Sequence, residues 1–141
     1  MNTTLLDSIA NRLKQEEGFR KFPYWDTAKV PQCTIGYGYN LTANGLPEDI
    51  CEELLNRSIQ KAVAQLVSAL PWVLRLSEPR QEVLVDMAYN LGIGGLKSFK
   101  TFLGLLEKGS YELASKAMLQ SLWAKQVGQR AVNLSEMIRK G

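Results

Sequence analysis

The stretch EGFRKFPYWDTAKVPQCTIGYGYN, residues 17–40, joins a helical pattern to a glycine-punctuated strand pattern. Glu17 ends the helical pattern, Asp26 follows nine positions later in a turn-prone segment, and Thr34 stands eight positions beyond it in the strand pattern. Two carboxylates and a hydroxyl therefore come from different local structures, which can present them to one cleft. Nothing else in the sequence is as specific.

The residues on either side of these groups carry the helix and sheet signals. Leu5, Ile9 and Leu13 recur at helical spacing, which predicts a first helix, and Gly18 is the kind of residue that commonly ends one. Residues 19–45 then bring aromatic and β-branched side chains interrupted by glycines, prolines and other turn residues. This change of character predicts a small antiparallel sheet with hairpin turns.

The rest of the chain has a helical pattern. Pro47 opens a long amphipathic helix with acidic residues in its first turns, and the pattern continues to about Leu70, where Pro71 breaks it. Shorter helices are expected at residues 79–91, 96–107, 110–120 and 128–139. The predicted fold class is α+β, mainly α, with a small antiparallel sheet lobe, a long connecting helix and a helical lobe.

The length of 141 residues suits a single domain. Within this domain, the sheet-containing lobe is expected at about residues 15–60, and the helical lobe at about 1–14 plus 61–141. Clefts between lobes are favoured ligand sites, so the candidate groups are expected to face one.

Composition excludes several kinds of protein and site. Hydrophobic residues make up 45% and charged residues 22%, with a net charge of +3, which is typical of a globular chain. No apolar run approaches the length of a membrane span, and because the first residues lack a basic segment followed by an apolar one, we expect no signal peptide there. The absence of histidine removes the commonest general base and metal ligand, so we expect no metal and no other cofactor. Cys33 and Cys51 are expected as reduced thiols, although a bridge between them stays open.

Glu17, Asp26 and Thr34 carry the kinds of side chain that hydrolysis of a glycosidic bond uses. The reaction uses a protonated acid at the leaving oxygen and a carboxylate that activates water or stabilises the developing positive charge. Carboxyl groups held by separate elements have different environments, which drives their pKa values apart. A hydroxyl adds a group that can hold water. From spacing alone, ordinary surface acids explain Glu17 and Asp26 more often than catalysis does.

Two other features have simpler explanations. The segment Gly36-Tyr37-Gly38 resembles a fragment of a nucleotide-binding glycine motif, but it lacks the third glycine and the following helix, so strand glycines are favoured. Tyr24, Trp25, Tyr37 and Tyr39 fit a sugar subsite, and packing of a small sheet explains them nearly as well.

Three motifs together resemble those of the phage-type lysozymes, the family of the T-even phage lysozyme and of many tailed-phage endolysins. The resemblance runs in family order from residue 13 to about 135. Its first part is specific and consists of Glu17-Gly18, Tyr24-Trp25-Asp26 and Thr34-Ile35-Gly36-Tyr37-Gly38. The later parts are Tyr89-Asn90-Leu91-Gly92 with a helix at Ser98-Phe99, and Leu122-Trp123 with Arg130-Ala131.

The resemblance implies roles for residues in this chain. Glu17 resembles the general acid, Asp26 the carboxylate that supports the transition state or steers water, and Thr34 the residue that positions this water. The supporting residues implied are Arg130, which resembles an arginine that pairs with the catalytic glutamate, and Asn90 and Trp123, which resemble residues of the cleft and hinge side. It also implies a lysozyme-like two-lobe fold.

The resemblance further implies that the chain cuts peptidoglycan between N-acetylmuramic acid and N-acetylglucosamine and lyses the bacterial host. The expected partner is the glycan strand, with no nucleic acid, no stable membrane insertion and a monomeric state. Without a signal peptide, the protein is expected to stay in the host cytoplasm until a holin lets it reach the periplasm and wall. A lytic transglycosylase and a silent wall-binding module remain alternatives.

Two positions depart from the family pattern. Tyr39 stands where the family often has histidine, which puts local packing in doubt more than activity. The spacing between Asp26 and Thr34 is two residues longer than in the T-even member, through Lys29-Val30-Pro31. A longer hairpin at this point is expected to affect the position of Thr34 or the entrance for substrate.

Overall fold

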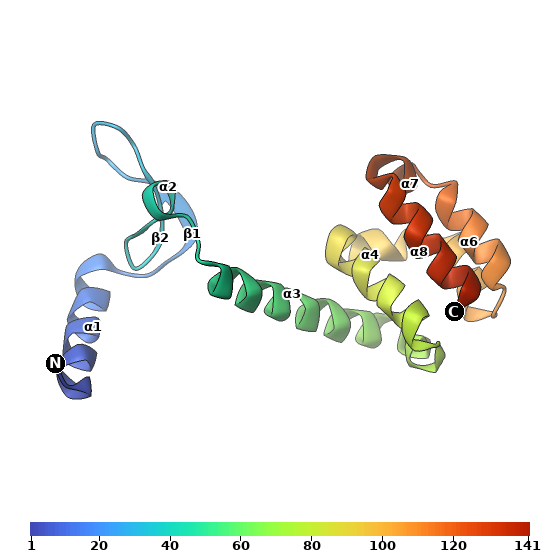
Figure 1. Cartoon of the computed structure of the whole chain (residues 1–141), viewed down its shortest axis with the longest axis horizontal. Helices are drawn as coiled ribbons and strands as arrows, with labels where there is room; N and C mark the ends of the chain where they lie inside the picture. The colour runs from blue at the N-terminus through green and yellow to red at the C-terminus, as the bar shows by residue number, and fades with distance from the viewer. The chain divides into compact units, whose positions relative to one another are not determined.

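The computed structural model describes all residues, 1–141, and divides into two compact units, residues 1–52 and 53–141 (Figure 1). The fold is α+β and mainly helical, as predicted. No helix is both long enough and apolar enough to cross a membrane. In chain order the elements are α1 (Thr3–Glu17), β1 (Arg20–Trp25), β2 (Cys33–Gly36), β3 (Tyr39–Asn40), α2 (Leu41–Asn44), α3 (Glu48–Ala69), the 3₁₀ helix η1 (Pro71–Arg75), α4 (Glu78–Lys97), α5 (Lys100–Glu107), α6 (Tyr111–Leu119), α7 (Leu122–Val127) and α8 (Gln129–Lys140).

Helix α1 has capping residues at both ends. At its start, the Asn2 side chain accepts a hydrogen bond from the backbone N–H of Leu5 at 2.9 Å, which satisfies one of the donors that a helix leaves free there. At its end, Gly18 has a φ of 70° and donates its N–H to the carbonyl of Lys14. Glycine adopts this left-handed conformation without steric cost, so the helix ends where the sequence predicts.

The sheet has three antiparallel strands in the order β1-β2-β3. Its central strand is β2, in which Thr34 stands opposite Tyr24 on one side and Asn40 on the other. The register of β1 against β2 shifts between Arg20 and Tyr24, which marks a bulge. A central strand has hydrogen-bonded neighbours on both sides, and Thr34 is the one buried side chain of residues 1–52, with 6% of its surface exposed.

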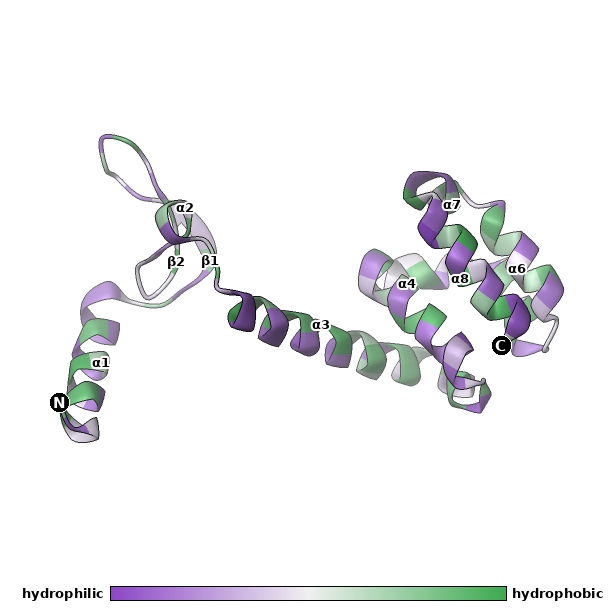
Figure 2. Cartoon of the chain, in the orientation of Figure 1, coloured by the Kyte–Doolittle hydropathy of each residue, from purple (hydrophilic) through white to green (hydrophobic).

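Helix α3 follows Pro47, as the sequence predicts, and carries Glu48 and Asp49 in its first turn, where negative charge complements the helix dipole. Hydrophobic residues gather along one side of this helix and hydrophilic residues along the other (Figure 2). Of this apolar stripe, Ala62 and Leu66 are buried. The boundary between the two compact units falls within α3.

The hydrophobic core belongs to residues 53–141. Helix α8 packs against α4, α6 and α7, and α5 packs against α6. Arg80 of α4 joins three of these helices, because its guanidinium lies 3.4 Å from the centre of the Tyr111 ring in α6 and donates to the Ile138 carbonyl in α8. The largest fully buried side chains are Phe102, Leu66, Leu84, Met87, Leu96, Leu106, Met118 and Ile138, with Val73, Val83 and Ser135.

Three details of the helical pattern differ from expectation. The expected helix at 96–107 is divided, because α4 continues to Lys97 and α5 begins at Lys100. Of the three glycines at which a break is expected, only Gly92 leaves the helical conformation, with φ 72° and ψ 162°, while Gly94 and Gly95 stay helical. The short helices α2 and α7 are not predicted by the periodicity, since neither is long enough to show one.

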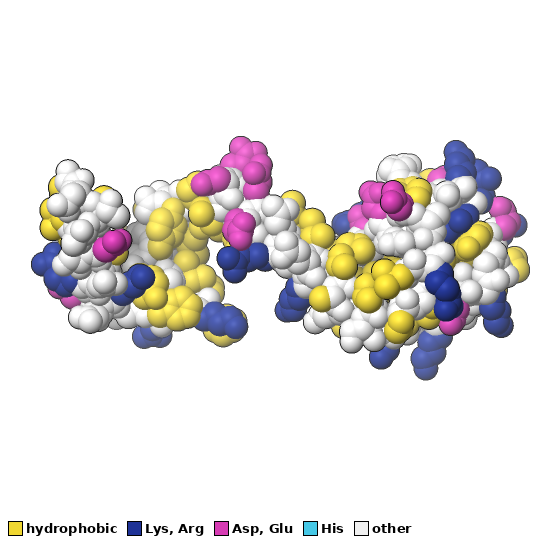
Figure 3. All heavy atoms as spheres, turned by 90° about the horizontal axis from the view of Figure 1, so that it is seen from below, with side chains coloured by type: hydrophobic (Ala, Val, Ile, Leu, Met, Phe, Trp, Pro, Cys, Tyr) yellow, Lys and Arg dark blue, Asp and Glu magenta, His cyan; other side chains and the backbone are white.

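Residues 1–52 bury almost no apolar surface of their own. The large side chains Phe19, Phe22, Trp25 and Val30 are all more than 60% exposed. Figure 3 shows hydrophobic side chains gathered on one face of this unit, with Lys and Arg beside them. The predicted grouping of residues 1–14 with the helical lobe concerns the placement of one unit against the other, and it stays a prediction.

Candidate active site

Glu17 is the last residue of α1, and its side chain is exposed. Its carboxylate lies over the turn between β2 and β3. An ideal β-carbon built on Gly38 in this turn would be 2.6 Å from Oε2 of Glu17. The helix end and the hairpin turn therefore come together at the carboxylate of Glu17.

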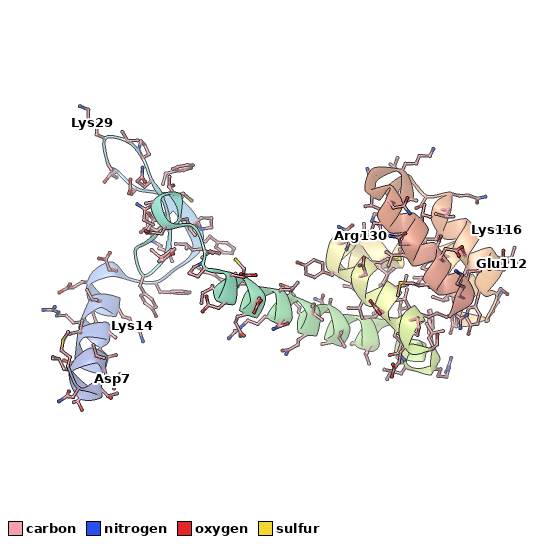
Figure 4. All side chains as sticks on the ribbon, in the orientation of Figure 1. Asp7, Lys14, Lys29, Glu112, Lys116 and Arg130 are labelled. Carbon is pink, nitrogen blue, oxygen red and sulfur yellow. The ribbon has the colours of Figure 1, made fainter.

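Asp26 follows directly after β1, at the start of the loop to β2. Its Oδ1 accepts hydrogen bonds from the backbone N–H of Gln32 at 3.0 Å and of Ala28 at 3.2 Å. Its own N–H donates to the Gln32 carbonyl at 2.9 Å. These bonds fix one carboxylate oxygen against the loop, while Oδ2 accepts none from the chain. The loop itself projects from the sheet, with Lys29 at its tip (Figure 4).

Thr34 is placed by the same residue that holds Asp26. Its Oγ1 donates to the Gln32 carbonyl at 3.5 Å, a long hydrogen bond that leaves the hydroxyl able to turn to another partner. The side chain of Gln32 in turn accepts from Nδ2 of Asn40 in β3 at 3.4 Å. Asp26 and Gln32 of the β1–β2 loop and Thr34 of β2 thus form one hydrogen-bonded group. The sequence motif includes Asp26 and Thr34 but not Gln32.

Arg130 lies at the start of α8 (Figure 4), where its guanidinium forms an ion pair with Asp86 of α4. Both Nη2 and Nε of Arg130 reach Oδ1 of Asp86, at 2.7 Å and 3.0 Å, and the two side chains are about a third exposed. Asp86 was not predicted from the sequence, because an aspartate inside a helical pattern gives no sign of its partner. The pairing of Arg130 with Glu17 stays a prediction.

Asn90 and Trp123 are brought together by α4 and α7. The indole Nε1 of Trp123 donates to Oδ1 of Asn90 at 2.8 Å, and the buried indole also meets the Phe99 ring edge-on at 6.1 Å. The amide nitrogen of Asn90 makes no hydrogen bond within the chain and remains able to donate. Asn90 belongs to one of the two motifs in the second half of the chain and Trp123 to the other, so neither motif alone predicts this contact.

Two hollows lie beside these residues within residues 53–141. The first has a volume of about 490 Å³ and includes Tyr89 and Asn90 in its lining, together with Ser58, Lys61, Ala62, Gln65, Ala88 and Gly92. The second has a volume of about 370 Å³ and places the Asp86–Arg130 ion pair beside Leu55, Ile59, Glu82, Val85 and Tyr89. Both hollows are open to solvent; the first has mixed polar and apolar walls, and the walls of the second are mainly apolar.

No group of three or more Cys, Asp or Glu side chains is placed to hold a metal ion, and histidine is absent from the sequence. Cys33 and Cys51 are free, the first half-buried and the second exposed.

Comparison with known proteins places these residues in a family. Residues 14–140 match phage lysozyme, a span that includes Glu17, Asp26, Thr34 and Arg130. The pre-baseplate central spike protein Gp5 of Enterobacteria phage T4 is 27% identical over 165 aligned residues, which cover 95% of this chain and 28% of that protein. An endolysin of Bacillus phage B103 is 30% identical over 121 residues, which cover 84% of this chain and 45% of that protein.

The chain thus spans less than half the length of each of these relatives. The family match, in contrast, extends from the last turn of α1 to the last turn of α8. It takes in the sheet, the long helix and the helical core alike, in the order that the sequence motifs predict. The chain belongs to the phage lysozyme family.

Proposed function

We propose that the chain is a lysozyme that hydrolyses the β-1,4 bond between N-acetylmuramic acid and N-acetylglucosamine in bacterial peptidoglycan. The observation that carries the proposal is the hydrogen-bonded group of Asp26, Gln32 and Thr34 at the β1–β2 loop and the start of β2, with Glu17 beside the next turn of the same unit. Membership of the phage lysozyme family supports glycoside hydrolysis as the class of reaction.

In this proposal Glu17 is the general acid that protonates the leaving oxygen. General acids act only within hydrogen-bond reach of the atom they protonate, so the position of this carboxylate matters as much as its proton. Its place at the end of a capped helix, beside a tight turn, supplies a fixed backbone for the side chain. Neither a metal nor a cofactor takes part.

Asp26 and Thr34 act together on the other side of the reaction. Asp26 has one oxygen bound to backbone N–H groups and one without a partner in the chain, so its charge is held in place while Oδ2 remains free. That oxygen stabilises the oxocarbenium-like transition state or steers the attacking water. The Thr34 hydroxyl, only loosely bound to Gln32, holds this water.

The first test replaces Glu17 by glutamine and measures the release of reducing ends from purified peptidoglycan. The amide keeps the shape of the side chain but cannot donate the proton, so activity should fall by about two to four orders of magnitude. Glu16→Gln is the matched control, since this neighbour is exposed and pairs only with Arg12 at 3.8 Å. Near-normal activity in a folded Glu17→Gln protein would remove this glutamate from the mechanism.

The biological role that we infer is lysis of the bacterial host at the end of infection. The protein would act as a monomer on glycan strands of the wall, reaching the periplasm through a holin. One relative is named an endolysin and the other a baseplate spike protein, so a role in the virion is the second candidate. Antibody detection separates the two: an endolysin is free in the lysate, and a spike component stays with purified particles.

Two rival functions are compatible with the same family resemblance. A lytic transglycosylase needs an acid but no attacking water, and the presence of both Asp26 and Thr34 favours hydrolysis over it. A catalytically silent wall-binding module needs no carboxylate pair at all. A turbidity assay on permeabilised Gram-negative cells excludes the silent module if the cells lyse and excludes the enzyme if they do not.

A further inference from the structure

The hairpin of β2 and β3 closes through two glycines that both have a positive φ. Ile35 pairs with Tyr39 across the hairpin, and the chain reverses through Gly36, the last residue of β2, and then Tyr37 and Gly38. Gly36 has a φ of 68° and Gly38 a φ of 73°, backbone angles that residues other than glycine rarely adopt. By backbone conformation alone, the two positions tolerate a substitution equally badly.

The space around the two glycines is very different. A β-carbon at Gly36 would meet nothing within 4 Å. A β-carbon at Gly38 would lie 2.6 Å from Oε2 of Glu17, 3.0 Å from its Cδ and 3.4 Å from its Cγ. The three nearest atoms thus all belong to the glutamate side chain. Its carboxylate occupies the place that any side chain at residue 38 would take.

The turn is also tied to the end of α1. The Tyr37 ring lies 5.5 Å from the Phe19 ring, centre to centre, and Nζ of Lys14 lies 5.9 Å from the centre of the Tyr37 ring. These contacts join the middle of the turn to residues on both sides of Glu17. A new group at residue 38 therefore displaces the end of the flexible glutamate side chain more readily than it displaces the turn.

We propose that Gly38 is a positioning residue for the carboxylate of Glu17, and that its lack of a side chain sets where this carboxylate lies. The proposal rests on the function proposed above, in which Glu17 is the general acid. A misplacement of about 1 Å at a reacting group can cost roughly a hundredfold in rate. Position 38 therefore controls the rate although it has no group that touches the substrate.

The test compares Gly38→Ala with Gly36→Ala in the full chain. Both variants place alanine at nearly the same positive φ, so their loss of thermal stability should be similar. Relative to Gly36→Ala, the kcat of Gly38→Ala on purified peptidoglycan should be about a hundredfold lower, with KM little changed. Equal kcat values in the two variants would overturn the proposal. A rise in KM and a fall in kcat of the same size in both variants would also overturn it, because the turn would then have only a structural role.

A second measurement does not depend on activity, so it separates this proposal from the proposed function. At one fixed pH, the carbon-13 chemical shift of the Glu17 carboxyl should differ from the wild-type value in Gly38→Ala and match it in Gly36→Ala, because only a β-carbon at residue 38 would crowd this carboxylate. An unchanged chemical shift in both variants would contradict the proposal even in an active enzyme. If the wild type is inactive, the proposed function fails, and this chemical shift still decides whether Gly38 sets the surroundings of the carboxyl.

The remaining difficulty is a Gly38→Ala protein that does not fold. In that case the double variant Glu17→Ala, Gly38→Ala is compared with Glu17→Ala, Gly36→Ala. Because the close contacts of the new β-carbon are with Glu17, its removal should restore folding at residue 38 to the level seen at residue 36. A double variant that stays unfolded while its counterpart folds would show that something other than Glu17 fills the space.

Discussion

At the scale of single residues, Gln32 holds both Asp26 and Thr34 in place through hydrogen bonds. Its backbone N–H and carbonyl both bond to Asp26, and the same carbonyl accepts from the Thr34 hydroxyl. The bonds that hold Asp26 and Thr34, the candidate catalytic residues, in place are thus largely bonds to the backbone of Gln32. A substitution of the Gln32 side chain therefore leaves most of the arrangement intact, whereas changes at Asp26 reach it directly.

Asp26→Asn separates the charge of this residue from its structural bonds. The amide oxygen of asparagine can still accept from the N–H groups of Ala28 and Gln32, so the loop should keep its conformation and the protein its thermal stability. Without the negative charge, the rate should fall by roughly two to three orders of magnitude, as when other transition-state charges lose a partner. Steady-state kinetics on purified peptidoglycan, with a melting curve, measure both. A folded Asp26→Asn enzyme with normal kcat would contradict the assigned role.

The sequence identifies the motif residues of the candidate site better than it identifies their hydrogen-bond and ion-pair partners. Glu17, Asp26 and Thr34 stand at fixed spacings around a helix end and a strand, so a motif can capture them. Gln32 acts mainly through its backbone, which any residue has, and Asp86 acts through a partner 44 positions along the chain. Neither type of interaction can be recognised in a single sequence. Gly38 can be recognised as part of the glycine motif, but the need for glycine there becomes clear only when the structure places Glu17 beside it.

At the scale of elements, α8 ends in a charged cluster whose effect on titration is measurable. Glu136 accepts hydrogen bonds from Nε and Nη2 of Arg139 at 3.0 Å and 2.8 Å, and Nζ of Lys140 is 3.4 Å away. These cations, Arg139 above all, lower the pKa of the Glu136 carboxyl to about 2. All three side chains are exposed to solvent, so the cluster should weaken at high salt.

The sign of the pH dependence follows from this lowered pKa. The unfolded chain has an ordinary glutamate at this position, with a pKa of about 4.3, so the cluster stabilises the folded protein fully above that value. The stabilisation is lost as the pH falls from there through about 2. Carbon NMR should place the Glu136 midpoint near that lower value, and Arg139→Gln should raise it, whereas Lys116→Gln should leave it unchanged. An ordinary midpoint in the wild type would refute the cluster.

Elements with a long repeat or a strong stop signal could be predicted, and short ones could not. The end of α1 at Gly18 and the start of α3 after Pro47 depend on single residues with restricted or permissive backbones. Helix α7 has six residues and begins at Ser121, whose hydroxyl accepts from the N–H of Ala124. Six residues make less than two helical turns, so the sequence shows no periodicity for this helix, and its capping residue Ser121 is the only signal. In α4, three nearby glycines mark a break, and nothing in their spacing indicates that Gly92 is the one that leaves the helical conformation.

At the scale of the whole molecule, the two compact units hold different parts of the proposed function. Residues 1–52 contain Glu17, Asp26 and Thr34 but bury almost no apolar side chains, and a small sheet without such a core is marginal by itself. Residues 53–141 contain the hydrophobic core, the Asp86–Arg130 ion pair and the Asn90–Trp123 hydrogen bond. The periodicity of the sequence predicts the helical unit well, because its apolar residues are the ones that become buried.

The central claim is that the chain breaks the glycan bond by adding water, and the fate of solvent oxygen tests it most directly. Purified peptidoglycan is digested in water enriched in oxygen-18, the products are reduced at once with borohydride, and the muropeptides are analysed by mass spectrometry. Hydrolysis predicts muramic acid ends that were reducing and that carry one solvent oxygen, formed by the wild type and not by Glu17→Gln. Products with 1,6-anhydromuramic ends and no solvent oxygen would contradict the account and identify a transglycosylase.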